Sequence, residues 1–114
     1  MVWYPKMGGQ MKFKAVYKLI YGEWDQYIEL HKDIMKIHQK NNGIDWHPRE
    51  FDSERQTITA YCDYEKLMDY RNASKAIDQL LASNNIVEEC IEMVEYTPSE
   101  MFTEIKLMRE VLSA

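Results

Sequence analysis

Cysteine, glycine and proline are scarce in this chain, and it has no long apolar run. The 114 residues include 2 Cys, 4 Gly and 3 Pro. Two cysteines cannot build the disulfide framework of a small secreted domain. The longest uncharged run near the middle, Gln79 to Val87, is far shorter than the ~20 residues of a membrane helix. The start of the chain also lacks the basic and apolar regions of a signal peptide. We therefore expect a cytoplasmic protein without a membrane span.

Motifs for several kinds of chemistry are also missing. The glycines are isolated or lie in the hinge at Gly8 and Gly9, so no phosphate-binding loop is present. There is no Cys-x-x-Cys metal motif and no Gly-x-Ser-x-Gly nucleophile elbow. We expect neither a metal nor another cofactor. The net charge of −5 disfavours binding to nucleic acid, and the basic and aromatic signature of an RNA-recognition sheet is absent.

What the chain does contain is a globular composition with many hydroxyl-bearing aromatic residues. Hydrophobic residues make up 46% and charged residues 29%, which is typical of one folded domain at this length. The 8 Tyr and 3 Trp outnumber the 3 Phe, so most aromatic side chains carry a polar group.

Hydrophobic periodicity divides the chain into strands and helices. Alternation of apolar and polar residues predicts a strand over 12–21, and β-branched residues predict one over 55–62. We also expect a strand over 44–51, where Pro48 indicates a sheet edge or a bulge, and a long strand over 86–97. Spacings of three and four predict a helix over 23–40, and a second that Asp63 caps and that reaches 83 with a break at 72–74. A capping box at 97–100 predicts a final helix over 98–114. Residues 1–11 are expected to form a flexible arm, and 12–97 the domain.

The order strand, helix, strand, strand, helix, strand predicts an α+β domain with its helices on one face of an antiparallel sheet. Right-handed crossovers favour the ferredoxin-like strand order 4-1-3-2. Charge agrees, because opposite charges stabilise neighbouring strands. The first predicted strand carries lysines and the fourth carries glutamates: Lys12, Lys14 and Lys18, and Glu88, Glu89, Glu92 and Glu95. This order also separates Cys62 from Cys90 by two strands, too far for a disulfide.

The length, the element order and the segment from Ala60 to Ser74, AYCDYEKLMDYRNAS, resemble proteins of the dimeric α+β barrel group. This ferredoxin-like group includes small monooxygenases of antibiotic biosynthesis and uncharacterised relatives. The resemblance implies a homodimer packed sheet against sheet, with a ligand cavity between the sheet and the helices of each protomer. It also implies site positions at Tyr61 and Tyr70, where monooxygenases of the group often have Trp and His. That departure disfavours heme-degrading and quinone-forming reactions.

Histidines are the first candidates for chemistry. His31 and His38 lie on the apolar side of the first predicted helix, about 10.5 Å apart along its axis, too far to share a metal ion. Each is a candidate acid, base or hydrogen-bond donor to a ligand. Alternatively, each makes its hydrogen bonds within a packed interface between helix and sheet or between subunits. On the second predicted strand, His47 shares a face with Asp45 and Arg49. These three could orient a carboxylate or carbonyl, or form a solvated sheet edge.

Tyrosines are the second group of candidates. Tyr17 and Tyr21 share a face of the first predicted strand, and Tyr27 lies on the inward side of the first helix with Trp24 and Met35. Phenol hydroxyls and adaptable methionines suit a cavity for an apolar molecule with a few oxygens, such as a fatty acid, polyketide or quinone. Ordinary packing would use the same residues.

Three hypotheses for function follow. The first is a cofactor-independent enzyme, monooxygenase or cyclase-like, with catalytic candidates His31, His38, Tyr61 and Tyr70. The second is a protein that binds such a molecule without reaction, with ligand-binding candidates Tyr17, Tyr21, Trp24, Tyr27, Met35 and His47. The third is a structural dimer with a filled core.

Overall fold

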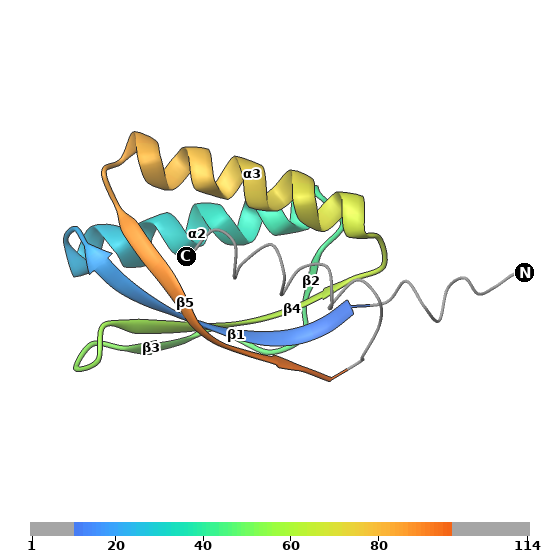
Figure 1. The fold of residues 1–114 in the computed structure, drawn as a ribbon, viewed down its shortest axis with the longest axis horizontal. Coiled ribbons are helices and arrows are strands. Elements are labelled where there is room, and N and C mark those ends of the chain that lie inside the picture. The colour runs from blue at the N-terminus through green and yellow to red at the C-terminus, as the bar shows by residue number, and fades with distance from the viewer. Residues whose placement is uncertain (1–10, 97–114) are drawn as a thin grey trace, which may run out of the picture.

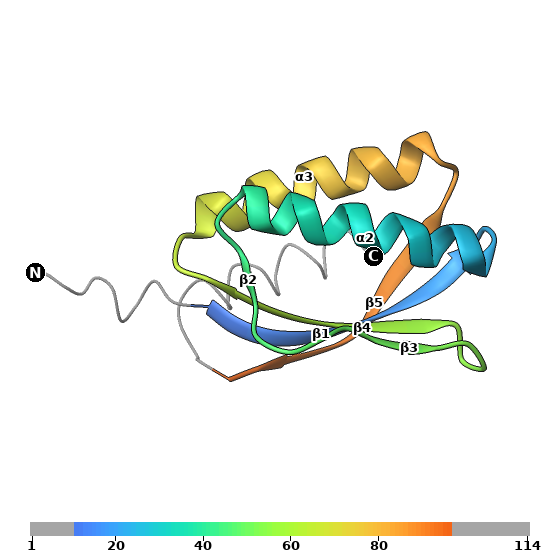
Figure 2. The same ribbon diagram turned by 180° about the vertical axis from the view of Figure 1, so that it is seen from behind.

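Two layers make up residues 11–96, the part of the chain that the computed structural model describes (Figure 1). One layer is a five-stranded antiparallel sheet. Helices α2 (Trp24–Lys40) and α3 (Leu67–Ser83) lie side by side on one of its faces (Figure 2). The strands are β1 (Met11–Tyr21), β2 (Ile44–Asp45), β3 (Glu50–Asp52), β4 (Thr57–Tyr64) and β5 (Val87–Glu95). The predicted α+β layout is confirmed, whereas residues 1–10 of the predicted arm and the predicted final helix lie outside the described residues.

β1 lies in the middle of the sheet. The strand order is β2-β4-β1-β5, and β3 also pairs with β4. β1 is therefore flanked by the strands that were predicted as third and fourth. Lys18 faces Glu89 across the pair of β1 and β5, as the charge argument expected. Cys62 on β4 and Cys90 on β5 lie on opposite sides of β1 and form no disulfide, in agreement with the predicted separation of two strands.

The second strand predicted over 44–51 is interrupted in the structure, where it forms two short strands, β2 and β3. β2 and β3 each pair with β4, but residues 46–49 between them leave the ladder. Pro48 has no N–H to donate to a neighbouring strand. The predicted common face of Asp45, His47 and Arg49 is lost with this interruption, because His47 is exposed whereas Arg49 is buried.

Both helices end in a left-handed residue, as the asparagines after the first predicted helix suggested. Asn42 has φ 66° and Asn85 has φ 55°. Each allows the chain to turn back, so that Gly43 N–H donates to the His38 carbonyl and Ile86 N–H donates to the Leu81 carbonyl. The Asp63 cap and the break at 72–74 are wrong: Asp63 is in β4, and α3 runs uninterrupted from Leu67.

The core lies between the helices and the inner face of the sheet. β4 turns Ile58, Ala60, Cys62 and Tyr64 towards the helices, where each is at most 1% exposed. α2 buries a stripe that is only partly apolar, consisting of Tyr27, Leu30, His31, Ile34 and His38. Two histidines and a tyrosine on this stripe bring polar groups into the layer that positions the candidate site. None of the helices among residues 11–96 combines the length and the apolar character of a membrane span.

Candidate functional site

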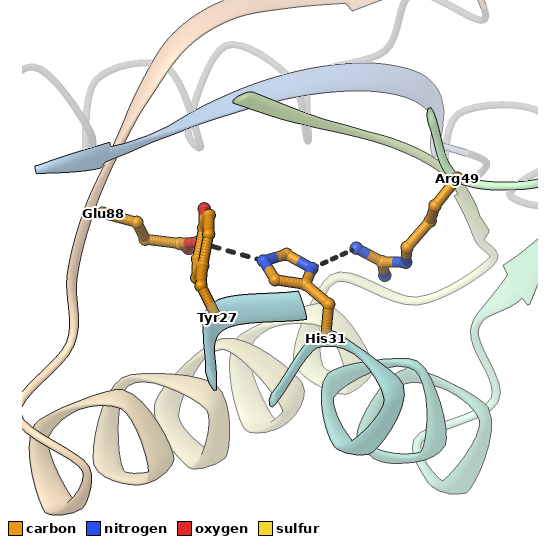
Figure 3. A network of polar contacts seen from close by, with 4 residues as sticks. All are labelled: Tyr27, His31, Arg49 and Glu88. Atoms are coloured by element: carbon orange, nitrogen blue, oxygen red, sulfur yellow. Dashed lines mark hydrogen bonds and ion pairs between the residues drawn. The ribbon is translucent and has the colours of Figure 1, made fainter. Parts of the chain in front are cut away.

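A chain of polar side chains crosses the layer between α2 and the sheet (Figure 3). Tyr27 donates its hydroxyl proton to Oε1 of Glu88 at 2.6 Å. His31 Nε2 lies 3.3 Å from the same oxygen. On the other side of the imidazole, Arg49 Nη1 lies 3.0 Å from His31 Nδ1. We call Tyr27, His31, Arg49 and Glu88 the polar cluster.

Three separate segments position these side chains. Tyr27 and His31 are four residues apart on α2 and therefore lie on one face of the helix. Glu88 is opposite Leu19 of β1, a buried residue of the inner face, so its side chain points towards the helices. Arg49 lies where the second predicted strand is interrupted, and Figure 3 shows it reaching His31 from the side opposite to Glu88.

The hydrogen bonds assign the tautomer of His31. A guanidinium can only donate, so Nδ1 of His31 accepts from Arg49 and its ring proton is on Nε2, facing Glu88. Burial lowers the pKa of His31, the Glu88 carboxylate partly opposes that shift, and the charge of Arg49 adds to it. The imidazole is therefore neutral near pH 7 and links one cation to one carboxylate.

Tyr27 acts as a donor in this arrangement. Its side chain is fully buried. Burial, together with the nearby Glu88 carboxylate, raises the pKa of Tyr27 well above its usual range. The phenol therefore keeps its proton and cannot serve as a base near pH 7.

Arg49 is unusual because it is buried with donors unused. The residue is 8% exposed. Its Nε and Nη2 are buried and have no hydrogen-bond partner, whereas Nη1 is engaged by His31. Buried polar groups are normally paired, so an unpaired guanidinium edge requires an explanation.

A second pair of polar side chains lies two turns further along α2. Nδ1 of His38 is 2.5 Å from the hydroxyl of Tyr64 on β4. Burial, reinforced by the charge of Arg49 and by an electrostatic interaction with His31, lowers the pKa of His38 to about 3. Tyr70 of α3 packs edge-on against Tyr64, with ring centres 5.6 Å apart. Three of the predicted catalytic residues thus lie in the layer between helices and sheet: His31, His38 and Tyr70.

The predicted ligand-binding residues of β1 and α2 are spread over a range of burial. Tyr17 is half-buried, and its ring centre is 6.3 Å from that of His31. Trp24 is half-buried and its ring centre is 5.9 Å from that of Tyr27. Met35 is also half-buried, whereas Tyr21 is 66% exposed at the end of β1. Tyr17 and Trp24 therefore lie beside the polar cluster, to which Tyr27 belongs, whereas Tyr21 does not line a buried layer.

Tyr61 and His47 lie on the other face of the sheet. Tyr61 points away from its neighbours Ala60 and Cys62, which face the helices. Its hydroxyl donates to Oε1 of Glu50 at 2.5 Å, and this bond raises the pKa of Tyr61 to about 12. The His47 ring centre is 4.3 Å from that of Tyr61. The structure thus divides the predicted site residues between two faces, and their roles stay predictions.

Glu88 completes the polar cluster but was not among the predicted site residues, and Arg49 was considered only together with Asp45 and His47. The sequence contains four glutamates on the strand of Glu88, and no pattern among them singles out an inward-facing one. Arg49 follows Pro48, and that proline was the available signal that the strand would be interrupted there. Among residues 11–96, no group of three His, Cys, Asp or Glu side chains could hold a metal ion.

The class of protein that these observations define is an α+β sheet protein with a buried polar chain beneath one helix. No protein-family model and no curated protein matches the chain. Its fold is similar to the crystal structure of MupZ from Pseudomonas fluorescens, with a TM-score of 0.66 and 9% sequence identity. The similarity covers 99% of this chain and 87% of that one. At this identity it shows the fold alone, and the ferredoxin-like dimeric barrel stays a prediction.

Proposed function

We propose that the protein binds a small, largely apolar, oxygenated molecule between α2 and the sheet. The observation that carries the proposal is the polar cluster, in which a buried Arg49 and a half-buried Glu88 lie on either side of a neutral His31. Well-packed apolar residues stabilise a core at least as well as a buried ion pair does. Binding sites for small molecules combine an apolar lining with a few convergent polar groups. A fatty acid, a polyketide or a quinone-like compound has this composition.

The arrangement favours binding over catalysis. Both ring nitrogens of His31 are occupied within the protein, Nε2 by Glu88 and Nδ1 by Arg49. A general base needs a free lone pair within reach of the substrate proton. The remaining phenol, Tyr27, is a donor to Glu88. The polar cluster is therefore equipped to position a ligand by hydrogen bonds.

A cofactor-independent enzyme, monooxygenase or cyclase-like, is the second candidate. The observation in its favour is that two side chains of acid–base type, Tyr27 and His31, are oriented by the same carboxylate oxygen of Glu88. An enzyme would convert the supplied molecule into a product of different mass or unsaturation, whereas a binding protein would return it unchanged.

We also propose that the chain is a ferredoxin-like protomer of a homodimer that packs sheet against sheet. Both described helices lie on one face of the sheet (Figures 1 and 2). On the other face, Ile20 is 53% exposed and Val16 is half-buried among lysines. A second sheet would cover these apolar side chains. The resemblance of the sequence to dimeric α+β barrel proteins supports the same arrangement.

Mass spectrometry tests the proposed binding. We expect the purified protein to carry a small molecule that native spectra retain and acid extraction releases. His31→Ala should reduce the retained fraction, because it removes the link between Arg49 and Glu88. Lys32→Ala, an exposed neighbour on α2, should retain it as the wild type does. A protein that carries nothing, and that binds neither octanol nor octanoate nor a naphthoquinone, would contradict the proposal.

A further inference from the structure

We infer that the molecule bound at this site carries a carboxylate, and that Nε and Nη2 of Arg49 hold it. The inference rests on the proposed function and names the chemical class of its ligand. It starts from the two buried guanidinium donors that have no partner.

The unpaired donors lie along one edge of the guanidinium. By atom naming, Nη1 is the nitrogen on the same side as Cδ, so Nε–H and Nη2–H point in parallel from the opposite edge. That edge matches the two oxygens of a carboxylate and forms a bidentate, charge-assisted pair with it. His31 already occupies Nη1, so the imidazole fixes the orientation of the guanidinium while the other edge stays open.

The open edge lies inside the protein. Arg49 is 8% exposed. Its Nη1 lies 3.0 Å from Nδ1 of the buried His31, so the guanidinium lies against α2. Leu30 and Ile34 of α2 pack in the same buried apolar cluster as Tyr27, so the layer around the polar cluster is apolar.

The charges nearby favour an anion with one negative charge over an anion with two, because the Glu88 carboxylate already lies across His31 from Arg49. His31 and His38 are neutral near pH 7, so neither adds a positive charge to that of Arg49. A phosphate monoester carries close to two negative charges at this pH and would need a further cation. A carboxylate needs only the one guanidinium edge that the structure leaves open.

Asp45 is the competing partner from the chain itself. Its Oδ2 is also buried without a hydrogen-bond partner, while its Oδ1 accepts from the thiol of Cys62 at 3.7 Å. If Arg49 turned towards Asp45 in solution, or bound a buried water, no ligand would be needed. The experiment must separate these two outcomes from a ligand carboxylate.

Titration of the ¹⁵N-labelled protein with carboxylates and matched alcohols makes this separation. The probes are acetate, butyrate and octanoate, with ethanol, butanol and octanol as neutral counterparts. We expect the Nε–H signal of Arg49 to move with the carboxylates and to stay in place with the alcohols. Octanoate should bind about tenfold or more tightly than octanol, because a hydrogen bond to a charged group is stronger than one to a neutral group.

Two arginine variants provide the matched comparison. Arg49→Lys keeps the charge but removes the bidentate edge, and should weaken octanoate binding about tenfold without changing octanol binding. Arg55→Lys alters an exposed arginine of the β3–β4 turn and should leave both affinities unchanged. Because the titration of the wild type is decisive by itself, a poorly folded Arg49→Lys protein would not remove the test.

The unfavourable outcomes are distinct. If octanol and octanoate bind equally and the Arg49 signal does not move, the carboxylate inference is wrong while the proposed binding function stands. If no carboxylate and no alcohol binds, both are wrong. Arg49 pairs with Asp45 if two results occur together. The Asp45→Asn substitution shifts the Nε–H signal of Arg49 in the ligand-free protein, and added carboxylates leave the signal of the wild type in place. If the Nε–H signal of Arg49 shows hydrogen exchange with water but moves neither with added carboxylates or alcohols nor on Asp45→Asn substitution, a buried water occupies the open edge of the guanidinium.

Discussion

His38 is a buried imidazole that stays uncharged down to about pH 3, whereas an unfolded histidine gains its proton near pH 6.5. Between these values the unfolded chain binds a proton that the folded protein does not. The free energy of unfolding therefore decreases as the pH falls, by up to about 1.4 kcal/mol per pH unit. The lowered pKa of His31 acts in the same direction. Urea unfolding between pH 7 and pH 5 measures this slope.

Replacement of His38 shows how much of the pH dependence of the free energy of unfolding comes from this residue. His38→Phe removes the titrating group, so its stability should depend less on pH than that of the wild type. His47→Gln, at an exposed histidine, should keep the wild-type dependence. A His38→Phe protein with the full slope would exclude His38 as its source.

Gly43 is required by its neighbours rather than by its backbone conformation. A Cβ atom at this position would lie 2.6 Å from Cζ of Tyr64 and 2.9 Å from the carbonyl oxygen of His38. The tyrosine ring is buried and the carbonyl belongs to the end of α2, so neither can move easily. Gly43→Ala should lower the free energy of unfolding by about 1–3 kcal/mol in urea titrations. Gln39→Ala, exposed on the last turn of α2, should change it by less than about 0.5 kcal/mol.

At the scale of the element, β5 presents glutamates to two different environments. Glu88 accepts hydrogen bonds from the core, whereas Glu89 is exposed opposite Lys18. Glu88→Gln removes the negative charge that balances Arg49 and should destabilise the protein by about 2 kcal/mol or more. Glu89→Gln should cost less than about 0.5 kcal/mol. Urea unfolding at pH 7 compares the two, and equal effects would mean that Glu88 is not part of a buried pair in solution.

Elements with one clear period could be predicted from the sequence. The helix over 23–40 and the strand over 12–21 nearly match α2 and β1, because burial of one face dictates their pattern. The continuous second strand was not predicted correctly, because Pro48 has no N–H for the ladder and interrupts a segment whose neighbours favour an extended conformation. The Asp63 cap failed because β4 continues to Tyr64, whose hydroxyl meets His38.

The polar cluster was only half predictable for a related reason. Tyr27 and His31 follow from helical spacing alone. The inward direction of Glu88 depends on the register between β5 and β1, which shifts between Val16 and Tyr17. A one-residue slip in register reverses the face of a strand residue, and the sequence shows no irregularity where that slip occurs.

At the scale of the whole molecule, the uncovered face of the sheet can be tested by size. If the proposed homodimer forms, light scattering during size-exclusion chromatography should give twice the chain mass of 13.7 kDa at micromolar concentration. Ile20→Glu places a charge on the face away from the helices and should yield monomers. Met68→Glu, on a methionine of α3 that is 58% exposed, should stay dimeric. A wild-type monomer would contradict the sheet-to-sheet dimer.

The polar cluster also affects the point during synthesis at which the chain can fold stably. β1, α2 and β4 precede α3 and β5, and Glu88 lies on the last described strand. When the ribosome has released the first 64 residues, Arg49 and His31 are available but their carboxylate is not. A buried guanidinium without a counter-charge is costly, so the helix-sheet layer gains its full stability only when β5 adds beside β1. Nascent chains truncated before Glu88 should remain sensitive to protease, and chains extended past β5 should become resistant.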